Sequence, residues 1–133
     1  MFEESDVIHS YTRAQAIADG CLFDVSEVAQ EAGFRISVAL TQSVMIDCVK
    51  WPESVEARKP GTGQDENGRL WDVLTMAHHA ARGAGGSQRV TFSVRRVPTE
   101  GGGIRPVEVA LVMCIGGGDS REPVITIMQP NED

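Results

Sequence analysis

The feature that most constrains the fold is a series of three strand-like segments in the last third of the chain. In RVTFSVRRV (residues 89–97) apolar and polar side chains alternate, which is the period of a strand with one buried face. VEVALVMCI (107–115) is apolar on both faces in its later half, as is typical of a central strand, and VITIM (124–128) gives a third strand. Because glycine-rich turns separate these segments, they predict an antiparallel sheet of three or more strands.

Two short helices are predicted near the start of the chain, each closed by a glycine. Thr12 can cap the first helix, and Gly20 can end it in the left-handed conformation that glycine tolerates. Asp24 or Ser26 can cap the second helix, and Gly33 can end it. Each helix carries an apolar face that has to be buried against another element.

The region that follows these helices has two readings. Residues 34–40 alternate in the manner of a strand but could also lead into a helix, so their structure stays open at this point. Residues 41–50 carry apolar side chains at helical spacing, and Pro52 prevents much continuation, which predicts a helix over 41–50.

The next segment, residues 52–68, is predicted to be a long loop. Its Asn67-Gly68 pair favours a tight hairpin turn, so residues 64–66 and 69–71 could form a small ribbon. A mid-chain helix follows, because one apolar stripe runs along it at helical spacing. The stripe consists of Leu70, Val73, Leu74, Ala77 and Ala81.

The order of the elements, helices first and strands after, predicts an α+β fold. Short N-terminal helices and a mid-chain helix would pack on a C-terminal antiparallel sheet of three or more strands, in a single domain over residues 1–133. The expected core contains Ile17, Val28, Val44, Cys48, Leu70, Trp71, Leu74, Phe92, Val94, Val109, Leu111, Val112, Ile125 and Ile127.

Charge is distributed unevenly along the chain, whose formal net charge is −7. Residues 1–31 contain a single base, Arg13, which disfavours direct binding of nucleic acid because phosphates are bound by clustered Lys and Arg. An acidic face can instead dock on a basic groove of another protein, or it can simply keep the protein soluble. The predicted partner-binding residues are Glu3, Glu4, Asp6, Asp19, Asp24, Glu27 and Glu31.

The histidine pair of the mid-chain helix has the wrong spacing for a metal site. His78 and His79 are about 100° apart on a helix, whereas a helical metal pair needs a spacing of four residues, and that position from His78 is Arg82. The glycine clusters match neither the dinucleotide-binding nor the phosphate-loop pattern and are interpreted as turns. We therefore expect no metal, no cofactor and no catalytic residue in these motifs. Trp71 is expected to anchor the preceding turn to the core rather than to bind a ligand.

The three cysteines and the first residues of the chain bear on where the protein works. Cys21, Cys48 and Cys114 are widely spaced among apolar neighbours, which predicts buried and reduced thiols. The N-terminal residues are acidic and lack the basic-then-apolar order of a signal peptide, and no apolar run approaches the roughly 20 residues of a membrane span. A cytoplasmic protein is predicted.

One segment keeps an enzymatic interpretation open. IHSYTRAQAIADG (residues 8–20) resembles the opening motif of ADP-ribosyltransferase-type enzymes. This resemblance implies that His9 and Thr12 would approach nicotinamide dinucleotide. The later tyrosine and glutamate elements of those enzymes have no clear counterpart, since Tyr11 is the only tyrosine of the chain.

The whole chain also resembles an uncharacterised family of short proteins carried by bacterial plasmids, prophages and conjugative elements. The matching strings are VIHSYTRAQAIADG, DVSEVAQEAGF, QDENGRLWDVL and EPVITIMQPNED. Small acidic proteins of such elements are often inhibitors of host defence, including anti-CRISPR proteins, which occupy surfaces that would bind nucleic acid. The resemblance therefore implies a non-enzymatic protein that binds and inhibits a nucleic-acid-handling defence complex, such as a CRISPR effector. The alternatives are an ADP-ribosyltransferase-like enzyme and a small regulatory or dimeric scaffold protein.

Overall fold

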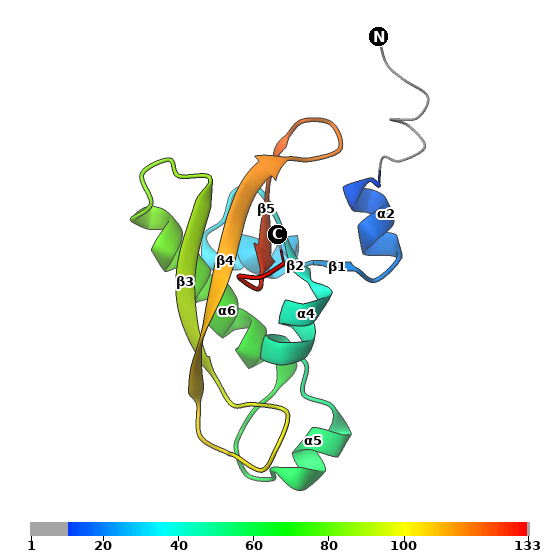
Figure 1. Ribbon diagram of the computed structural model, residues 1–133, viewed down its shortest axis with the longest axis vertical. Helices are drawn as coiled ribbons and strands as arrows, with labels where there is room; N and C mark the ends of the chain where they lie inside the picture. Colours follow the sequence, from blue (N-terminus) through cyan, green and yellow to red (C-terminus); the bar gives the residue numbers. More distant parts are fainter. Residues whose placement is uncertain (1–10, 133) are drawn as a thin grey trace.

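The computed structural model describes residues 11–132, which form a mixed five-stranded sheet with the strand order β1-β2-β5-β4-β3 (Figure 1). β2 pairs in parallel with β5, and the remaining pairings are antiparallel. The strands are β1 (Leu22–Asp24), β2 (Ser37–Thr41), β3 (Arg89–Arg96), β4 (Val107–Gly117) and β5 (Pro123–Met128).

The prediction of a purely antiparallel, C-terminal sheet is wrong. β3, β4 and β5 form where the three strand-like segments placed them, but β1 and β2 come from the first third of the chain and extend the sheet beyond β5. β2 overlaps residues 34–40, whose sequence pattern fits either a strand or the start of a helix. Its Val38 and Leu40 are fully buried, and Val38 pairs with Ile125 of β5. The segment is a strand because pairing with β5 leaves both of these apolar side chains buried.

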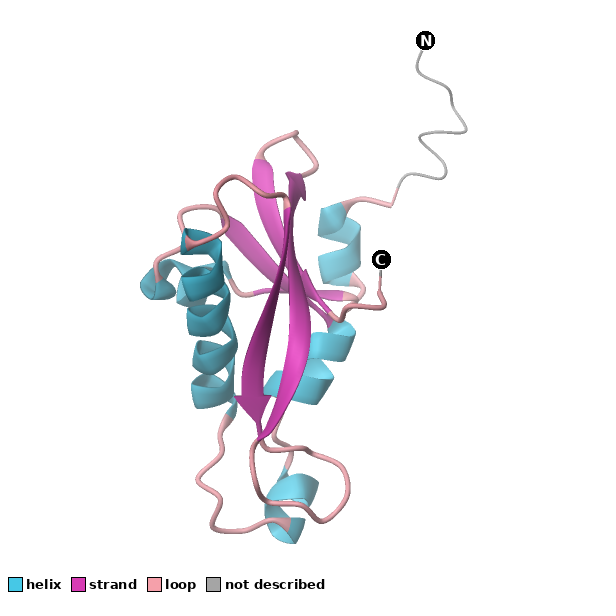
Figure 2. Ribbon diagram, turned by 60° about the vertical axis from the view of Figure 1, so that its left-hand side comes forward, coloured by secondary structure: helices cyan, strands magenta, loops and turns pink. Residues whose placement is uncertain are grey.

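Two strands, β1 and β2, also lie between the helices of the first half of the chain, so the helices do not all precede the sheet. α3 and α6 lie on one side of the sheet and α2 lies on the other (Figure 2). The segment predicted as a helix over 41–50 is helical but contains a π-helical turn, and α5 was missed within the predicted loop. The helical elements are α2 (Arg13–Ala18), α3 (Ser26–Ala32), α4 (Gln42–Val44), the π-helix η1 (Met45–Val49), α5 (Glu53–Arg58) and α6 (Glu66–Arg82).

The ends of the two N-terminal helices follow local sequence. Thr12 forms a capping box at the start of α2, and both predicted glycine stops have positive φ. At the start of α3 the N-cap position itself is taken by Val25. Asp24 still contributes, because its Oδ1 accepts a hydrogen bond from Ser26 N at 3.0 Å.

The hairpin predicted at Asn67-Gly68 does not form. Both residues lie in the first turn of α6, where Asp65 is the N-cap and accepts a hydrogen bond from Gly68 N at 2.6 Å. The preference of Asn-Gly for a tight turn is weak compared with a capped helix whose apolar stripe packs against the core over about three turns. α6 therefore starts before the predicted ribbon would have ended.

The core lies between the sheet and the α3, α6 and η1 helices. Most of the predicted core residues are buried, while Ile17, Val28, Leu70 and Val109 are half-buried. Trp71 contradicts the prediction, since 42% of it is exposed. The predicted core residues that are buried are Val44, Cys48, Leu74, Phe92, Val94, Leu111, Val112, Ile125 and Ile127.

One arginine of α6, Arg69, is buried, which the sequence did not predict. Arg69 is 3% exposed and stacks on the Trp51 ring, with its guanidinium carbon 4.9 Å from the ring centroid. Its guanidinium donates to the carbonyls of Val49 (3.1 Å) and Val97 (2.9 Å), among others. The widened turn of η1 presents main-chain carbonyls to this side chain, so Arg69 joins α6, η1 and the end of β3. The spacing of three residues between Arg69 and Asp72 on a helix predicts an exposed ion pair, and this prediction is wrong because Arg69 is buried.

Candidate functional site

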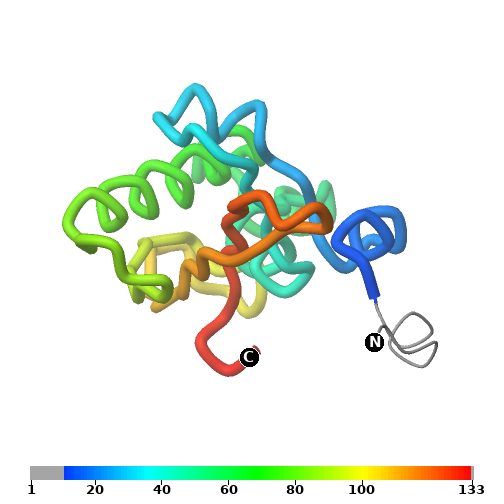
Figure 3. The backbone as a smooth tube through the Cα atoms, turned by 90° about the horizontal axis from the view of Figure 1, so that it is seen from above, coloured from blue at the N-terminus to red at the C-terminus, as the bar shows by residue number. Residues whose placement is uncertain are grey.

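The surface along which α3 and α6 meet is the part of the molecule that brings the predicted binding residues together. The two helices lie side by side (Figure 3) and run in the same direction. Leu70 lines a cavity with Glu27 and Val28 at the start of α3, and the His78 ring packs edge-on against Phe34 just after its end. We call the solvent-exposed surface formed by Glu27, Glu31 and Trp71 the α3–α6 surface.

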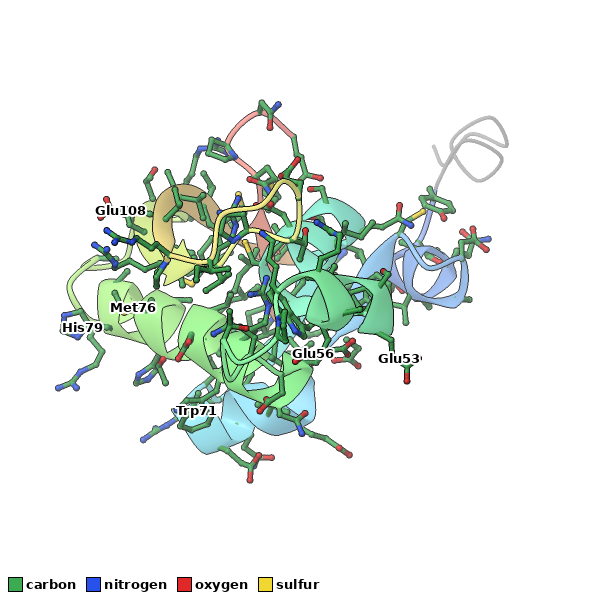
Figure 4. The ribbon with its side chains drawn as sticks, turned by 90° about the horizontal axis from the view of Figure 1, so that it is seen from below. Glu53, Glu56, Trp71, Met76, His79 and Glu108 are labelled. Atoms are coloured by element: carbon green, nitrogen blue, oxygen red, sulfur yellow. The ribbon has the colours of Figure 1, made fainter. Side chains whose placement is uncertain are left out.

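Gly33 is what allows this close approach of the two helices. Its φ is +114°, and a Cβ atom placed there would lie 2.7 Å from Cε1 of His78. Glycine therefore serves both the left-handed end of α3 and the contact with α6. His78 is a packing residue, whereas His79 points outward (Figure 4).

Trp71 is an exposed aromatic residue on the side of α6 that faces α3. Seven residues separate it from His78, which is about two helical turns, so the two side chains share one stripe of α6. Figure 4 shows Trp71 beside α3, away from Met76. Helical spacing indicates that Trp71 lies outside the apolar stripe, because Leu70 belongs to that stripe and the next residue of a helix is about 100° away from it. The prediction that both residues lie in the core is therefore wrong for Trp71.

Glu27 and Glu31 are exposed on α3 and spaced four residues apart. Carboxylates at this spacing repel each other and destabilise a helix by about 0.2–0.5 kcal/mol. Glu31 also lies in the last turn, where a negative charge opposes the helix dipole. Within residues 11–132 no cation forms an ion pair with either side chain. The stability of α3 therefore does not explain why Glu31 is acidic.

A cavity of about 370 Å³ opens at the start of α3, and we call it the α3 pocket. Val25 at its base is buried, and Val28 and Leu70 are half-buried. Asp24 and Glu27 are exposed at its rim. The lining residues are Asp24, Val25, Ser26, Glu27, Val28 and Leu70.

The other predicted acids are divided between two places. Glu3, Glu4 and Asp6 lie outside the described residues. Asp19 is exposed at the end of α2 and accepts a hydrogen bond from the Tyr11 hydroxyl at 2.6 Å, which raises the pKa of Tyr11 above its ordinary value. Of the seven predicted binding residues, the structure thus places Asp24, Glu27 and Glu31 on or beside α3 and leaves Asp19 on another helix.

Two further acids near Asp24 come from the turn between β4 and β5. Asp24, Asp119 and Glu122 line a second cavity of about 190 Å³ together with Arg13. Asp119 accepts hydrogen bonds from the backbone N–H groups of Ala14 (3.0 Å) and Arg13 (2.7 Å), and these bonds lower its pKa. Asp119 therefore serves the start of α2. The sequence could not place it there, because the turn lies some hundred residues downstream.

Several cations point into the protein and leave the surface more acidic than the sequence suggests. Arg13 donates to Thr126 Oγ1 and to the Ile125 carbonyl, each at 2.7 Å. Lys59 is 1% exposed and donates to three main-chain carbonyls, and Arg96 forms an ion pair with Asp47 at 2.9 Å. Arg69 and Arg58 also donate to main-chain carbonyls, so at least five of the 12 basic side chains are held by internal partners. Exposed acids consequently dominate the surface.

The residues of the enzymatic interpretation do not assemble into a site within the described part of the chain. His9 lies outside it. The Thr12 hydroxyl accepts a hydrogen bond from Gln15 N, and the Tyr11 hydroxyl is bound to Asp19. Among residues 11–132 there is no group of three or more His, Cys, Asp or Glu side chains that could hold a metal ion.

The cysteines are free thiols in different surroundings. Cys48 is buried and Cys114 is half-buried, whereas Cys21 is exposed, contrary to the prediction that all are buried. Burial raises the pKa of the Cys48 thiol to about 12.

Within residues 11–132, no helix has the length and apolar character needed to cross a bilayer.

Comparison with known proteins gives a family but no function. No curated protein and no solved structure matches this chain. A family model does match, over residues 1–133, and it carries the description "Family of unknown function (DUF6573)". The chain therefore belongs to the DUF6573 family.

Proposed function

We propose that the protein is a non-enzymatic binding protein whose α3–α6 surface docks on a basic surface of another protein. The observations that carry this proposal are the exposed Trp71 on the side of α6 that faces α3 and the exposed acids Glu27 and Glu31 of α3, of which Glu31 lies unfavourably in the last turn of its helix. Tryptophan is enriched among the residues that dominate binding energy, because it buries a large area in one rigid side chain. Carboxylates around such an anchor select a basic partner and speed its approach.

The class of partner follows from the charge and from the family resemblance. Surfaces that bind nucleic acid carry clustered Lys and Arg, and an acidic protein can occupy them without resembling nucleic acid in structure. The channel of an RNA-guided effector is one strongly positive surface of this kind. The resemblance to proteins of plasmids, prophages and conjugative elements favours such a defence complex in the cytoplasm as the partner. In this proposal the protein inhibits the complex by covering its nucleic-acid channel.

The test is binding to purified CRISPR effector complexes, measured by calorimetry, with and without guide RNA and target DNA. Trp71→Ala should weaken binding by roughly 30-fold or more, the loss expected when a dominant interface residue is truncated. Met76→Ala is the matched control, because Met76 is 43% exposed on the same helix but lines the groove beside β3.

Glu27→Lys/Glu31→Lys tests the electrostatic part and should abolish binding to the effector. Binding that survives both this double change and Trp71→Ala would show that the α3–α6 surface is not the interface. If the wild-type protein binds no effector and leaves immunity to plasmids and phages unchanged, the assignment to defence complexes is wrong.

A further inference from the structure

The α3 pocket combines apolar lining residues with acidic ones. Val28 and Leu70 are half-buried and still open to the cavity, while Asp24 and Glu27 are exposed. Its volume of about 370 Å³ is near the low end of the roughly 300–1,000 Å³ of small-ligand sites. A space of this size suits one long side chain better than a large ligand.

We infer that the α3 pocket receives a single arginine side chain of the partner. This inference rests on the proposed function for the existence of a basic partner. The methylene groups of arginine would lie on Val28 and Leu70, and the guanidinium would reach Asp24 and Glu27 at the rim. Arginine suits the site better than lysine, because its planar group is more weakly hydrated and its several N–H donors can engage two carboxylates at once.

Asp24 at this rim also has a structural role at the start of α3, but that role does not explain why the pocket is lined by apolar side chains. Asp24 accepts hydrogen bonds from Ser26 N (3.0 Å) and Ser26 Oγ (2.5 Å), and both fall on Oδ1. Among the described residues no hydrogen bond falls on Oδ2, although the carboxylate also faces Arg13 across the second cavity. Capping of a short helix also gives no reason to leave the apolar side chains of Val28 and Leu70 open to solvent.

The pocket can be tested on the full chain without knowing the partner. The probe is N-acetyl-arginine-amide, titrated into ¹⁵N-labelled protein and followed by the amide chemical shifts. The expected result is saturable shifts at residues 24–28 and 70, weakened by salt. The citrulline analogue, which has the same shape without the charge, should bind several-fold more weakly.

Two variants separate recognition from folding. Asp24→Asn keeps an oxygen that can accept the Ser26 hydrogen bonds, so α3 should stay intact, and Glu27→Gln removes one exposed charge. Each should weaken the arginine probe by about two- to fivefold, the range of one exposed ion pair. Glu53→Gln, an exposed acid on α5, is the control that should leave it unchanged.

The outcomes distinguish this inference from the proposed function. Shifts that are absent, or equal for the arginine and citrulline probes, overturn the arginine site even if an effector binds through Trp71. Saturable arginine binding that depends on Asp24 and Glu27 supports the site even if no effector binds. A stronger response to the lysine analogue would overturn the choice of arginine.

Discussion

Replacing Arg69 is the most direct test of how α6 is fixed to the rest of the fold. Besides the Val49 and Val97 carbonyls, its guanidinium donates to Gln64 Oε1 at 2.8 Å and to the Asp47 carbonyl at 3.3 Å. Arg69→Met preserves the apolar length of the side chain but leaves four acceptors without their donor. Each buried acceptor left unpaired costs about 1–3 kcal/mol, and water entering the site recovers part of this.

We expect Arg69→Met to lower the free energy of unfolding by about 3–5 kcal/mol, because several buried acceptors lose a donor together. Urea denaturation followed by circular dichroism measures this loss. Arg69→Lys keeps the charge but has fewer donors in a different geometry, so its loss should be intermediate. Arg82→Met, in the exposed last turn of the same helix, should cost less than about 1 kcal/mol. A loss below about 1 kcal/mol for Arg69→Met would refute the view that this guanidinium holds α6, η1 and β3 together.

Other predictions address the core, the surface and the thiols. Leu74 is completely buried, so Leu74→Ala should cost about 2–5 kcal/mol in the same denaturation assay, and a loss under about 0.5 kcal/mol would mean that α6 packs through another face. Glu31→Lys should stabilise the isolated protein by about 0.3–1 kcal/mol, because a cation suits the end of a helix, while it weakens partner binding; a destabilised variant would contradict our account of α3. At pH 8 a thiol reagent should modify Cys21 rapidly and Cys48 only on unfolding, because the raised pKa keeps the buried Cys48 thiol protonated; equal rates would contradict its burial.

The features that could be predicted from the sequence are those that neighbouring residues determine. Thr12 caps α2 because its hydroxyl reaches an N–H three residues away, and Gly33 ends α3 because glycine tolerates positive φ. The C-terminal strands were predictable for the same reason, since alternation reports directly on a one-sided buried surface. Glu27 and Glu31 were likewise identifiable as an exposed acidic pair on a short helix.

The features that could not be predicted depend on residues far apart in the chain. β2 is a strand because β5 lies beside it, and the sequence of residues 34–40 does not indicate which segment it will pair with. Arg69 is buried because carbonyls from η1 and β3 converge on it, although its local spacing suggested an exposed ion pair. The α3 pocket needs Leu70 of α6 to complete it, so Asp24 and Glu27 could be identified as acids but not as the rim of a cavity.

The parallel pairing of β2 with β5 has a consequence for the order in which the protein folds. β2 is made early in synthesis, yet its ladder from Val38 to Ile125 cannot form until the last strand of the sheet has been translated. Closing so long a loop is entropically costly and slow compared with forming the α2 or α6 helix. A nascent chain therefore carries β2 with its β5-facing edge unpaired until residues 123–128 have been made, and the arrival of that segment completes the sheet.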